Sequence, residues 1–482
     1  MQNVFKSVET LDKSAVERFH LSNEILMENA ASAIEQIIDE RVSASNALII
    51  IVCGRGDNGA DGFALARRLS AKYNIKVFAP ESLANRTQSD LNALQRERFE
   101  AVGGKFIDKL FSCDMIVDCL FGSGFSGEID LQMGDLIAQM NAIGRLKIAC
   151  DISSGLLATN AKSLKIKSAE SIESKAHESK NDLVFKADIT IAMGALKSAY
   201  FSDFAKDFVG EIALANLGIS RANYESDSNI KLLEISDLKL PQRFAQNTHK
   251  GRFGHSCVIA GEKEGACILS ALSAFAFGSG LVSIIGEVKN LPHHIMNATQ
   301  LPNNCNAIAF GMGLGAKIER YNFDFLGKIP SVIDADMFYH NDLRGILEKG
   351  NLVLTPHLKE FSSALKILGF GEFSIREIEC KKIELMMDFS SRFPNVVLLL
   401  KGANVFIAQK EKIYINTLGR NNLAKGGSGD VLSGLIVALL AQGYSLLDSA
   451  INASLAHSLA SQKVQSSFGL EPMDLINVIK TL

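Results

Sequence analysis

Hydrophobic and polar positions follow two rhythms in the first half of the chain. Residues 21–42 carry apolar side chains about every 3.6 residues, including Ile25, Leu26, Ala30, Ile34, Ile37 and Ile38, which predicts an amphipathic helix. Short apolar, β-branched runs then recur at 47–54, 75–79, 115–120, 146–152 and 188–193. Most are separated by stretches long enough for a helix. Strands buried on both faces and alternating with helices predict a Rossmann-like, doubly wound parallel sheet.

The second half repeats this α/β alternation on a different plan. Strands are predicted at 256–260, 280–286, 306–311, 331–336, 352–355 and 396–401, followed by a hairpin of 404–409 with 412–416. Helices are predicted at roughly 429–441, 446–463 and 472–481. The polar stretch 219–230 lacks an apolar rhythm and makes a plausible boundary. We therefore expect two α/β domains, residues 1–222 and 223–482.

Two segments depart from this alternation. Residues 161–180 are rich in charges and serines without an apolar period, so we expect a solvated insertion. Residues 265–286 are uncharged and long enough to span a bilayer. However, Gly278, Ser279 and Gly280 interrupt the run, which favours a buried helix, a glycine turn and a buried strand.

Composition narrows the function classes. The chain has 482 residues, with 50 Lys plus Arg against 53 Asp plus Glu and a formal charge of −3, so it lacks the basic excess expected of a nucleic-acid or anionic-lipid binder. Hydrophobic residues at 47% exclude a mostly disordered chain. The eight cysteines form no CxxC pair and are typical of buried thiols in a reducing compartment. With an N-terminus that lacks a continuous apolar run, these features predict a cytoplasmic protein with no membrane partner.

Glycines and aspartates lie at three strand ends of the first half. The segment 54–62 (GRGDNGADG) follows a predicted strand and precedes a helix over FALARRL, and its Gly54, Gly56 and Gly59 fit GxGxxG. Asp57 and Asp61 argue against an ordinary dehydrogenase, because carboxylates repel pyrophosphate. The segments 118–124 (DCLFGSG) and 151–155 (DISSG) end two other strands. Carboxyl ends of parallel strands open onto one crevice, so these motifs predict a binding site, although each aspartate alone could be a cap or turn residue.

These motifs, with residues 26–30 (LMENA), resemble the NAD(P)HX epimerase domain over about residues 1–218. NAD(P)HX is the hydrated form of NAD(P)H. The resemblance implies contacts with the hydrated nucleotide from Asp57, Asn58, Gly59, Ala60, Asp61, Gly122, Ser123, Gly124, Phe125, Ser126, Gly127, Glu128 and Asp151. It also implies a potassium ion (K+) held by Asn58, Asp118 and Ser154. Asp57, Ala60 and Ser153 depart from the residues usual in that family. We expect Asp151 to be the general acid/base.

A second glycine-rich turn precedes an apolar helix in the second half. In residues 425–430 (KGGSGD), backbone N–H groups can surround an anion, and Asp430 can take a proton from a hydroxyl that attacks a phosphoryl group. The alternative is a turn with Asp430 as a cap. Further polar motifs at 248–251, 311–315, 355–360 and 401–402 adjoin predicted strands and outline a nucleotide and substrate cleft. Taken singly, His357 would more often be a structural cap.

This half resembles the ribokinase-like superfamily and, within it, the ADP- or ATP-dependent NAD(P)HX dehydratase, over about residues 230–482. The segments that carry the resemblance are THKGRFGH, FGMGLG, TPHLKE, LLLKGANV and KGGSGDVLSG. It implies that the hydrated nucleotide contacts Ala266, Gly313, His357 and Asp430. It implies that the adenine nucleotide, bound with Mg2+, contacts Lys401, Gly402, Ala403, Asn404, Val405 and Gly429.

The two halves together predict a bifunctional nicotinamide-nucleotide repair enzyme. Its substrates would be NADHX, NADPHX and ADP or ATP, and we expect a homo-oligomer. Phosphorylation turns the C6 hydroxyl of the hydrated ring into a leaving group, and an epimerase rescues the other epimer. Two alternatives stay open at this point. One is a vitamin or sugar kinase fused to a Rossmann-like module, and the other is a non-enzymatic protein- or RNA-binding role for the first half.

Overall fold

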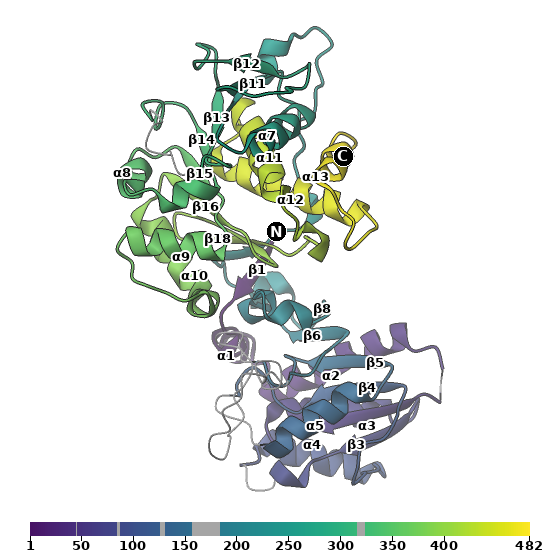
Figure 1. Ribbon diagram of the computed structural model, residues 1–482. Coiled ribbons are helices and arrows are strands. Elements are labelled where there is room, and N and C mark those ends of the chain that lie inside the picture. Colours follow the sequence, from purple (N-terminus) through teal and green to yellow (C-terminus); the bar gives the residue numbers. More distant parts are fainter. Residues whose placement is uncertain (45, 84–86, 126–130, 157–183, 316–322) are drawn as a thin grey trace, which may run out of the picture. The chain divides into compact units, whose positions relative to one another are not determined.

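The computed structural model describes residues 1–44, 46–83, 87–125, 131–156, 184–315 and 323–482 (Figure 1). The chain divides into two compact units, an N-terminal unit of Asn3–Ser228 and a C-terminal unit of Met1–Gln2 with Asn229–Leu482. The predicted insertion 161–180 lies outside the described ranges.

A parallel sheet forms the centre of the N-terminal unit, with strand order β3-β2-β4-β5-β6-β8. The strands are β2 (Leu48–Cys53), β3 (Asn74–Phe78), β4 (Met115–Cys119), β5 (Leu146–Cys150), β6 (Ile189–Met193) and β8 (Glu211–Ala215). The strands β2 to β6 coincide with the apolar runs of the sequence. This confirms the predicted doubly wound α/β fold.

Helices cover both faces of this sheet, because alternate residues of each strand point to opposite sides. Ile49 and Ile51 of β2 join a core cluster with side chains of α2 (Asn23–Arg41), α3 (Asp57–Leu69) and Phe99 of α4 (Asp90–Ala101). Ile50 and Val52 join a second cluster with α5 (Leu131–Ala142). The unit also contains β1 (Gln2–Phe5) from Asn3 onward, α1 (Glu9–Phe19), η1 (Glu81–Leu83), β7 (Leu196–Lys197), η2 (Ser198–Phe201), η3 (Ala205–Asp207) and α6 (Arg221–Tyr224).

Two local predictions for this unit were wrong. The helix after the glycine loop begins at Asp57, not at FALARRL, so residues 57–62 of the motif are helical. Gly59 and Gly62 make this possible, because they let the first turns of α3 lie against the ends of β2 and β4. In α2, Ile25 is 44% exposed although its spacing suggested burial, and Met27 is buried instead.

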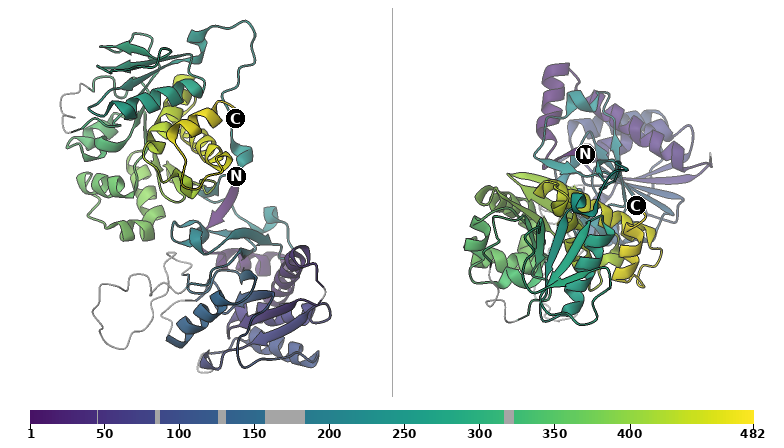
Figure 2. Two further views of the ribbon diagram at one scale, coloured as in Figure 1. Left: turned by 45° about the vertical axis from the view of Figure 1, so that its right-hand side comes forward. Right: turned by 90° about the horizontal axis from the view of Figure 1, so that it is seen from above.

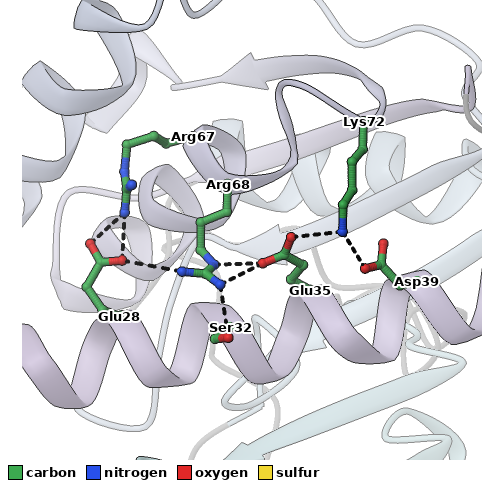
Figure 3. Close-up of polar contacts among 7 residues, drawn as sticks. All are labelled: Glu28, Ser32, Glu35, Asp39, Arg67, Arg68 and Lys72. Carbon is green, nitrogen blue, oxygen red and sulfur yellow. Dashed lines mark hydrogen bonds and ion pairs between the residues drawn. The ribbon is translucent and has the colours of Figure 1, made fainter.

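A ladder of ion pairs joins α2 to α3 and the turn after it (Figure 3). It consists of Glu28 with Arg67, Arg68 with Ser32 and Glu35, and Lys72 with Glu35 and Asp39. The α2 residues are spaced by three or four positions, which places them on one helix face. Partly exposed pairs contribute only about 0.2–1 kcal/mol each. The apolar cluster that Ile34 and Ile38 share with Phe63 and Leu65 therefore contributes more to the packing of α3 than the ladder does.

A second, mostly parallel sheet forms the centre of the C-terminal unit, with order β12-β11-β10-β13-β14-β15-β16-β17-β18-β9. The strands are β9 (Ile230–Leu232), β10 (His255–Ile259), β11 (Leu281–Ile285), β12 (Met296–Ala298), β13 (Ala307–Phe310), β14 (Ser331–Ile333), β15 (Leu352–Leu354), β16 (Val396–Leu400), β17 (Val405–Gln409) and β18 (Lys412–Asn416). The hairpin of β17 and β18 is antiparallel, as predicted. Its turn residues Lys410 and Glu411 both have positive φ, at 49° and 62°.

Helices lie on both sides of this sheet (Figures 1 and 2). One side is covered by α7 (Glu264–Ala276), α11 (Ser428–Ala441), α12 (Leu446–Lys463) and α13 (Pro472–Ile479), which share a core cluster with the strands. The other side carries α8 (Leu343–Glu348), α9 (Leu358–Ile367) and α10 (Ile375–Arg392). Short turns complete the unit, namely η4 (Ile235–Asp237), η5 (Lys250–Phe253), η7 (Ala335–Tyr339) and η8 (Asn421–Leu423).

The uncharged segment 265–286 has the structure predicted for it. It forms most of α7, a turn in which Gly278 has φ +100°, and β11. Among the described residues, no helix has both the length and the apolar character needed to cross a bilayer.

Candidate functional site

The glycine motif of the N-terminal unit packs at very short range. A Cβ atom at Gly54 would lie 2.0 Å from the carbonyl oxygen of Leu120, and one at Gly59 would lie 2.1 Å from that of Gly54. A side chain at either position would push the start of α3 away from the ends of β2 and β4. The glycines therefore allow backbone segments to approach each other closely, which is the role that such residues have at phosphate-binding turns.

Asn92 of α4 anchors this turn, although no role was predicted for it. It is 1% exposed, and its Nδ2 donates to the carbonyl oxygens of Gly54 and Gly56, at 3.0 Å each. Gln88 donates in turn to Asn92 Oδ1 at 2.8 Å. An amide is suited to this position because it satisfies two carbonyl groups at once. No local pattern distinguishes Asn92 from an ordinary polar helix residue.

Asp118 and Ser154 lie together at the ends of β4 and β5. Ser154 donates its backbone N–H to Asp118 Oδ2 at 2.8 Å and its hydroxyl to Oδ1 at 2.7 Å. The backbone N–H of Leu120 also donates to Oδ1, at 3.1 Å. Burial raises the pKa of Asp118 to about 6, although these hydrogen bonds oppose the shift.

Asp151 follows β5 and is held on both carboxylate oxygens. Its φ of +67° is unusual for a residue other than glycine. Oδ2 accepts the backbone N–H of Ser123 at 2.7 Å, and Oδ1 forms an ion pair with Lys197. Tyr200 donates its hydroxyl to the Asp151 carbonyl oxygen at 2.7 Å. Burial alone would raise the pKa of Asp151, but Lys197 and the Ser123 hydrogen bond outweigh it and hold the pKa below its ordinary value.

Lys197 is the main residue that sequence reasoning missed. Its side chain is 2% exposed, yet it lies in β7 beside β1 and reaches both Asp151 and the pocket described below. Burial lowers the pKa of Lys197, but the Asp151 carboxylate reverses the effect and raises it overall. The ion pair therefore stays charged at neutral pH. A lysine in a two-residue strand gives no sequence signal of this kind.

A pocket of about 810 Å³ opens beside these groups within the N-terminal unit. From the predicted set, Asp57, Asp61, Ser123 and Gly124 line it, and Lys197 and Asp12 are further lining residues. Asp151 itself lies behind Ser123 and Lys197. Among the other predicted residues, Gly59 and Ala60 are buried in α3, Gly122 and Phe125 lie in the loop after β4, and Ser126, Gly127 and Glu128 lie outside the described residues.

The pKa of Asp61 bears on phosphate binding, because an ionised carboxylate in the glycine motif would repel a phosphate group. Burial raises the pKa of Asp61 well above its ordinary value, and the charges of Asp151 and Asp57 add to the shift. A carboxyl group with a raised pKa carries less negative charge and therefore repels an anion less. The Asp61 carboxyl is then compatible with a phosphate-bearing ligand.

Asn58 is a buried amide that lacks a protein partner. It is 8% exposed, and within the described residues neither its Oδ1 nor its Nδ2 has a hydrogen-bond partner. A Cβ atom at Gly122 would lie 3.1 Å from Asn58 Cβ and 3.4 Å from Asp151 Oδ2. The backbone at Gly122 thus lies close to both side chains. An unsatisfied buried amide at such a position is typical of a ligand contact.

In the C-terminal unit, the predicted glycine turn lies directly before α11. Gly427 is the N-cap with φ +90°, and a Cβ atom there would lie 2.7 Å from Pro472 and 2.9 Å from Leu269. Asp430 lies in the first turn of α11 and is half-buried. Burial raises the pKa of Asp430 to about 6, with a further rise from Asp334 and an opposing effect of Lys401.

Lys401 and Asp334 form a polar group beside this turn. Lys401 Nζ lies 2.8 Å from Asp334 Oδ1, and Ser433 of α11 donates to Oδ2 at 2.9 Å. A Cβ atom at Gly429 would lie 3.5 Å from Lys401 Nζ, so the structure brings together the predicted residues Lys401 and Gly429. Asp334 was missed, although an aspartate directly after the run SVI repeats the signal used at Asp118 and Asp151.

The remaining predicted residues of this unit lie at the start of α9, after β13 and in the turn between β16 and β17. His357 is the N-cap of α9, where its Nδ1 accepts the backbone N–H of Glu360 at 3.1 Å, and it pairs with Lys401 in an isolated bridge. Gly313 follows β13 with φ +61°, and a Cβ atom there would lie 3.3 Å from Ala266 of α7. Residues Gly402, Ala403 and Asn404 form the turn from β16 into β17, where Val405 begins the strand.

The family models match the two halves separately. The model described as "YjeF-related protein N-terminus" matches residues 23–199, and the model described as "NAD(P)H-hydrate dehydratase" matches residues 256–482. These matches fall in the N-terminal and C-terminal units, respectively.

Relatives match along the whole chain. The bifunctional NAD(P)H-hydrate repair enzyme of Helicobacter pylori is 43% identical over 100% of both chains. The enzyme of the same name from Dictyoglomus turgidum is 30% identical over 98% of this chain and 96% of its own. Among solved structures, an ADP/ATP-dependent NAD(P)H-hydrate dehydratase from Bacillus subtilis is 23% identical over 53% of this chain and 98% of its own, with a TM-score of 0.43.

Proposed function

The chain belongs to the family of bifunctional NAD(P)H-hydrate repair enzymes, and we propose that its two activities are divided between the two units. It is an NAD(P)H-hydrate epimerase and a nucleotide-dependent NAD(P)H-hydrate dehydratase. The epimerase belongs to residues 1–222 and the dehydratase to residues 223–482. The observation that carries this division is the separate placement of the two sites. The pocket at Lys197 is lined by the N-terminal unit, and the Asp430 turn lies in the C-terminal unit.

In the epimerase, the hydrated nicotinamide ring enters the pocket beside Asp61, Ser123 and Lys197. Asp151 is the proton-transferring group, in agreement with its ionised state and its place at a sheet edge. Ser123 and Lys197 fix both of its oxygens. Phosphate groups of the nucleotide lie at the start of α3, where backbone N–H groups and the helix dipole favour negative charge.

A potassium ion fits the polar group around Asn58, Asp118 and Ser154. The support is the chemistry of the donors, since amide, carboxylate and hydroxyl oxygens are all hard ligands, together with the buried and unpartnered amide of Asn58. Bound there, the ion would supply positive charge that offsets Asp118 and the phosphates of the substrate. Asn58, Asp118 and Ser154 would hold it.

Potassium is expected to stabilise the chain through Asn58. Exchanging tetramethylammonium chloride for KCl at equal ionic strength should raise the thermal midpoint of unfolding by several degrees, because a ligand at about 100 times its Kd stabilises by about 2.7 kcal/mol. Differential scanning fluorimetry measures this difference directly. The Asn58→Ala variant should lose it. Equal midpoints of the wild-type chain in the two salts would contradict the potassium site.

In the dehydratase, Asp430 acts as the general base. It takes the proton from the C6 hydroxyl of the hydrated ring, and the oxygen attacks the terminal phosphoryl group of the nucleotide. Backbone N–H groups of the turn 426–429 and the ammonium of Lys401 stabilise the charge on the phosphoryl oxygens. The ring nitrogen then expels phosphate, and loss of a proton from C5 restores the reduced nicotinamide. The nucleotide is ADP, entering as its Mg2+ complex, with ATP as the alternative.

The dehydratase rate is expected to fall below about pH 6. A general base must be ionised, and the pKa of Asp430 is raised to about 6, so the carboxylate is present above that pH and lost below it. At pH 5 about a tenth of the rate should remain. Stopped assays at saturating nucleotide measure the profile. The pKa of Glu360 is also raised by burial, so Glu360→Gln tests the assignment and should keep the inflection. An inflection that disappears with Glu360→Gln would transfer the role of base to Glu360.

Product analysis distinguishes this function from that of a small-molecule kinase. The purified chain is incubated with NADHX, ADP and Mg2+, and the products are separated by ion-pair chromatography. We expect NADH, AMP and phosphate. A stable phosphorylated nucleotide would instead favour the kinase. A cytoplasmic location and self-association of the chain stay predictions from the sequence.

A further inference from the structure

Helix α1 carries an aspartate on its buried face. Val8, Leu11 and Ala15 are 8%, 5% and 1% exposed and belong to one apolar cluster, together with Leu217 and Tyr224. These positions follow the spacing i, i+3 and i+7 of a helix face that points into a core. Asp12 occupies the i+4 position of the same face, where an apolar residue would be expected.

A tyrosine holds the Asp12 carboxylate. The Tyr224 hydroxyl donates to Asp12 Oδ1 at 2.6 Å, and the ring of Tyr224 is packed in the apolar cluster at 5% exposure. Burial raises the pKa of Asp12, against the lowering effects of Tyr224 and Lys197. Asp12 thus tends to keep a proton at a pH where Asp151 has lost its own.

Asp12 also lines the pocket that Lys197 and Asp61 line. Its carboxyl comes from α1, whereas the predicted site residues come from the edge of the sheet and the start of α3. Glu9 and Glu17 of α1 also line this pocket, but both are exposed, and the Glu17 carboxylate lies 3.8 Å from Lys13 Nζ. The pocket is therefore bordered by two groups of carboxyls that belong to different elements.

We propose that Asp12 is a second catalytic residue of the epimerase, and that Tyr224 is its positioning residue. The proposal rests on the assignment of epimerase activity to this unit. Inversion at C6 requires that oxygen leave from one face of the ring and return to the other. Two proton-transferring groups from different elements are suited to this task, one protonated and one ionised.

The proposed step exchanges one water molecule. Asp12 gives its proton to the C6 hydroxyl, the C6–O bond breaks, and its electron pair leaves with the departing water. The lone pair of the ring nitrogen forms a double bond to C6. A water molecule on the opposite face then adds its oxygen to C6 and loses a proton to the sheet-edge carboxylate, assigned above as Asp151. Proton exchange with solvent then returns both carboxyls to their starting states, and no oxidant or reductant is needed.

Asp12→Asn is expected to slow epimer exchange by at least about 10²-fold, the lower end of the cost of losing a proton-transferring group. Exchange is measured by following pure R-NADPHX on a chiral column. Tyr224→Phe should lower kcat and leave KM close to the wild-type value, because it disturbs the position of Asp12 and not the binding of substrate. Glu40→Gln removes a carboxylate from an exposed position of α2 that does not line the pocket and should cost a few-fold at most, since exposed charges are screened.

The controls separate folding, function and mechanism. Asp12→Asn should retain the thermal midpoint of the wild-type chain, its binding of NADPHX in calorimetry and its ADP-dependent dehydratase rate. Exchange in 18O-labelled water should place one labelled oxygen at C6 for each inversion. Wild-type exchange by a folded Asp12→Asn variant would overturn the role of Asp12, and inversion without label would overturn the water-exchange step. Absence of exchange by the wild-type chain itself would instead refute the proposed epimerase.

Discussion

Asp430→Asn is expected to slow nucleotide-dependent dehydration by about 10²–10⁴-fold, which corresponds to roughly 3–5 kcal/mol of barrier. The side chain keeps its size and much of its capping ability but can no longer take the proton of the C6 hydroxyl. The rate is measured as recovery of the near-ultraviolet absorbance of the reduced nicotinamide ring.

Three other properties of the Asp430→Asn variant should survive. Nucleotide binding should persist, because backbone N–H groups and Lys401 are unchanged. Epimer exchange should persist, because its residues lie in the other unit and distant sites seldom couple. The thermal midpoint should not fall, because burial and Asp334 disfavour the charge that the substitution removes. A variant that keeps more than about a tenth of the dehydratase rate would show that Asp430 is only a cap.

Asp151→Asn is expected to slow epimer exchange by about 10²–10⁴-fold. The substitution also leaves Lys197 buried without its ionic partner, and breaking such a pair typically costs about 3–5 kcal/mol of folding stability. Loss of exchange could therefore reflect loss of folding. Chiral chromatography of NADPHX must be accompanied by a melting curve of the same preparation.

The double variant Asp151→Asn with Lys197→Met removes this ambiguity. It takes away both charges, so most of the lost stability should return. Exchange should stay as slow as in the single variant, because the proton-transferring group is still absent. Recovery of exchange in the double variant would mean that Asp151 serves only to neutralise Lys197.

The sequence predicted the strands better than the side chains that complete the sites. The buried apolar runs and the glycines at 54, 59 and 427 leave a local trace, because close packing excludes other residues. Asp12 also leaves a local trace in the sequence, because an ordinary amphipathic helix has no carboxylate within its apolar face. Asp334 could have been found by the same reasoning as Asp151.

Lys197 and Asn92 could not have been found from the sequence. Their roles depend on partners far along the chain, namely Asp151 for Lys197 and the carbonyl group of Gly54 for Asn92. Which buried lysine has an ionic partner is decided by the tertiary fold and not by its neighbours in sequence. The early start of α3 was missed for a related reason. Glycines lower helix propensity locally, but the packing of Gly59 and Gly62 against the sheet overrides that preference.

The central claim is that one chain repairs both epimers by two separate sites. The most direct test gives pure R-NADHX to the purified chain, first alone and then with ADP and Mg2+. Without nucleotide, we expect a mixture of R and S epimers and no NADH. With nucleotide, we expect the whole pool to become NADH, and the Asp430→Asn variant to stop at the mixture of epimers. Recovery of NADH without any epimer exchange, or R-NADHX that persists unchanged in the presence of ADP, would contradict the account.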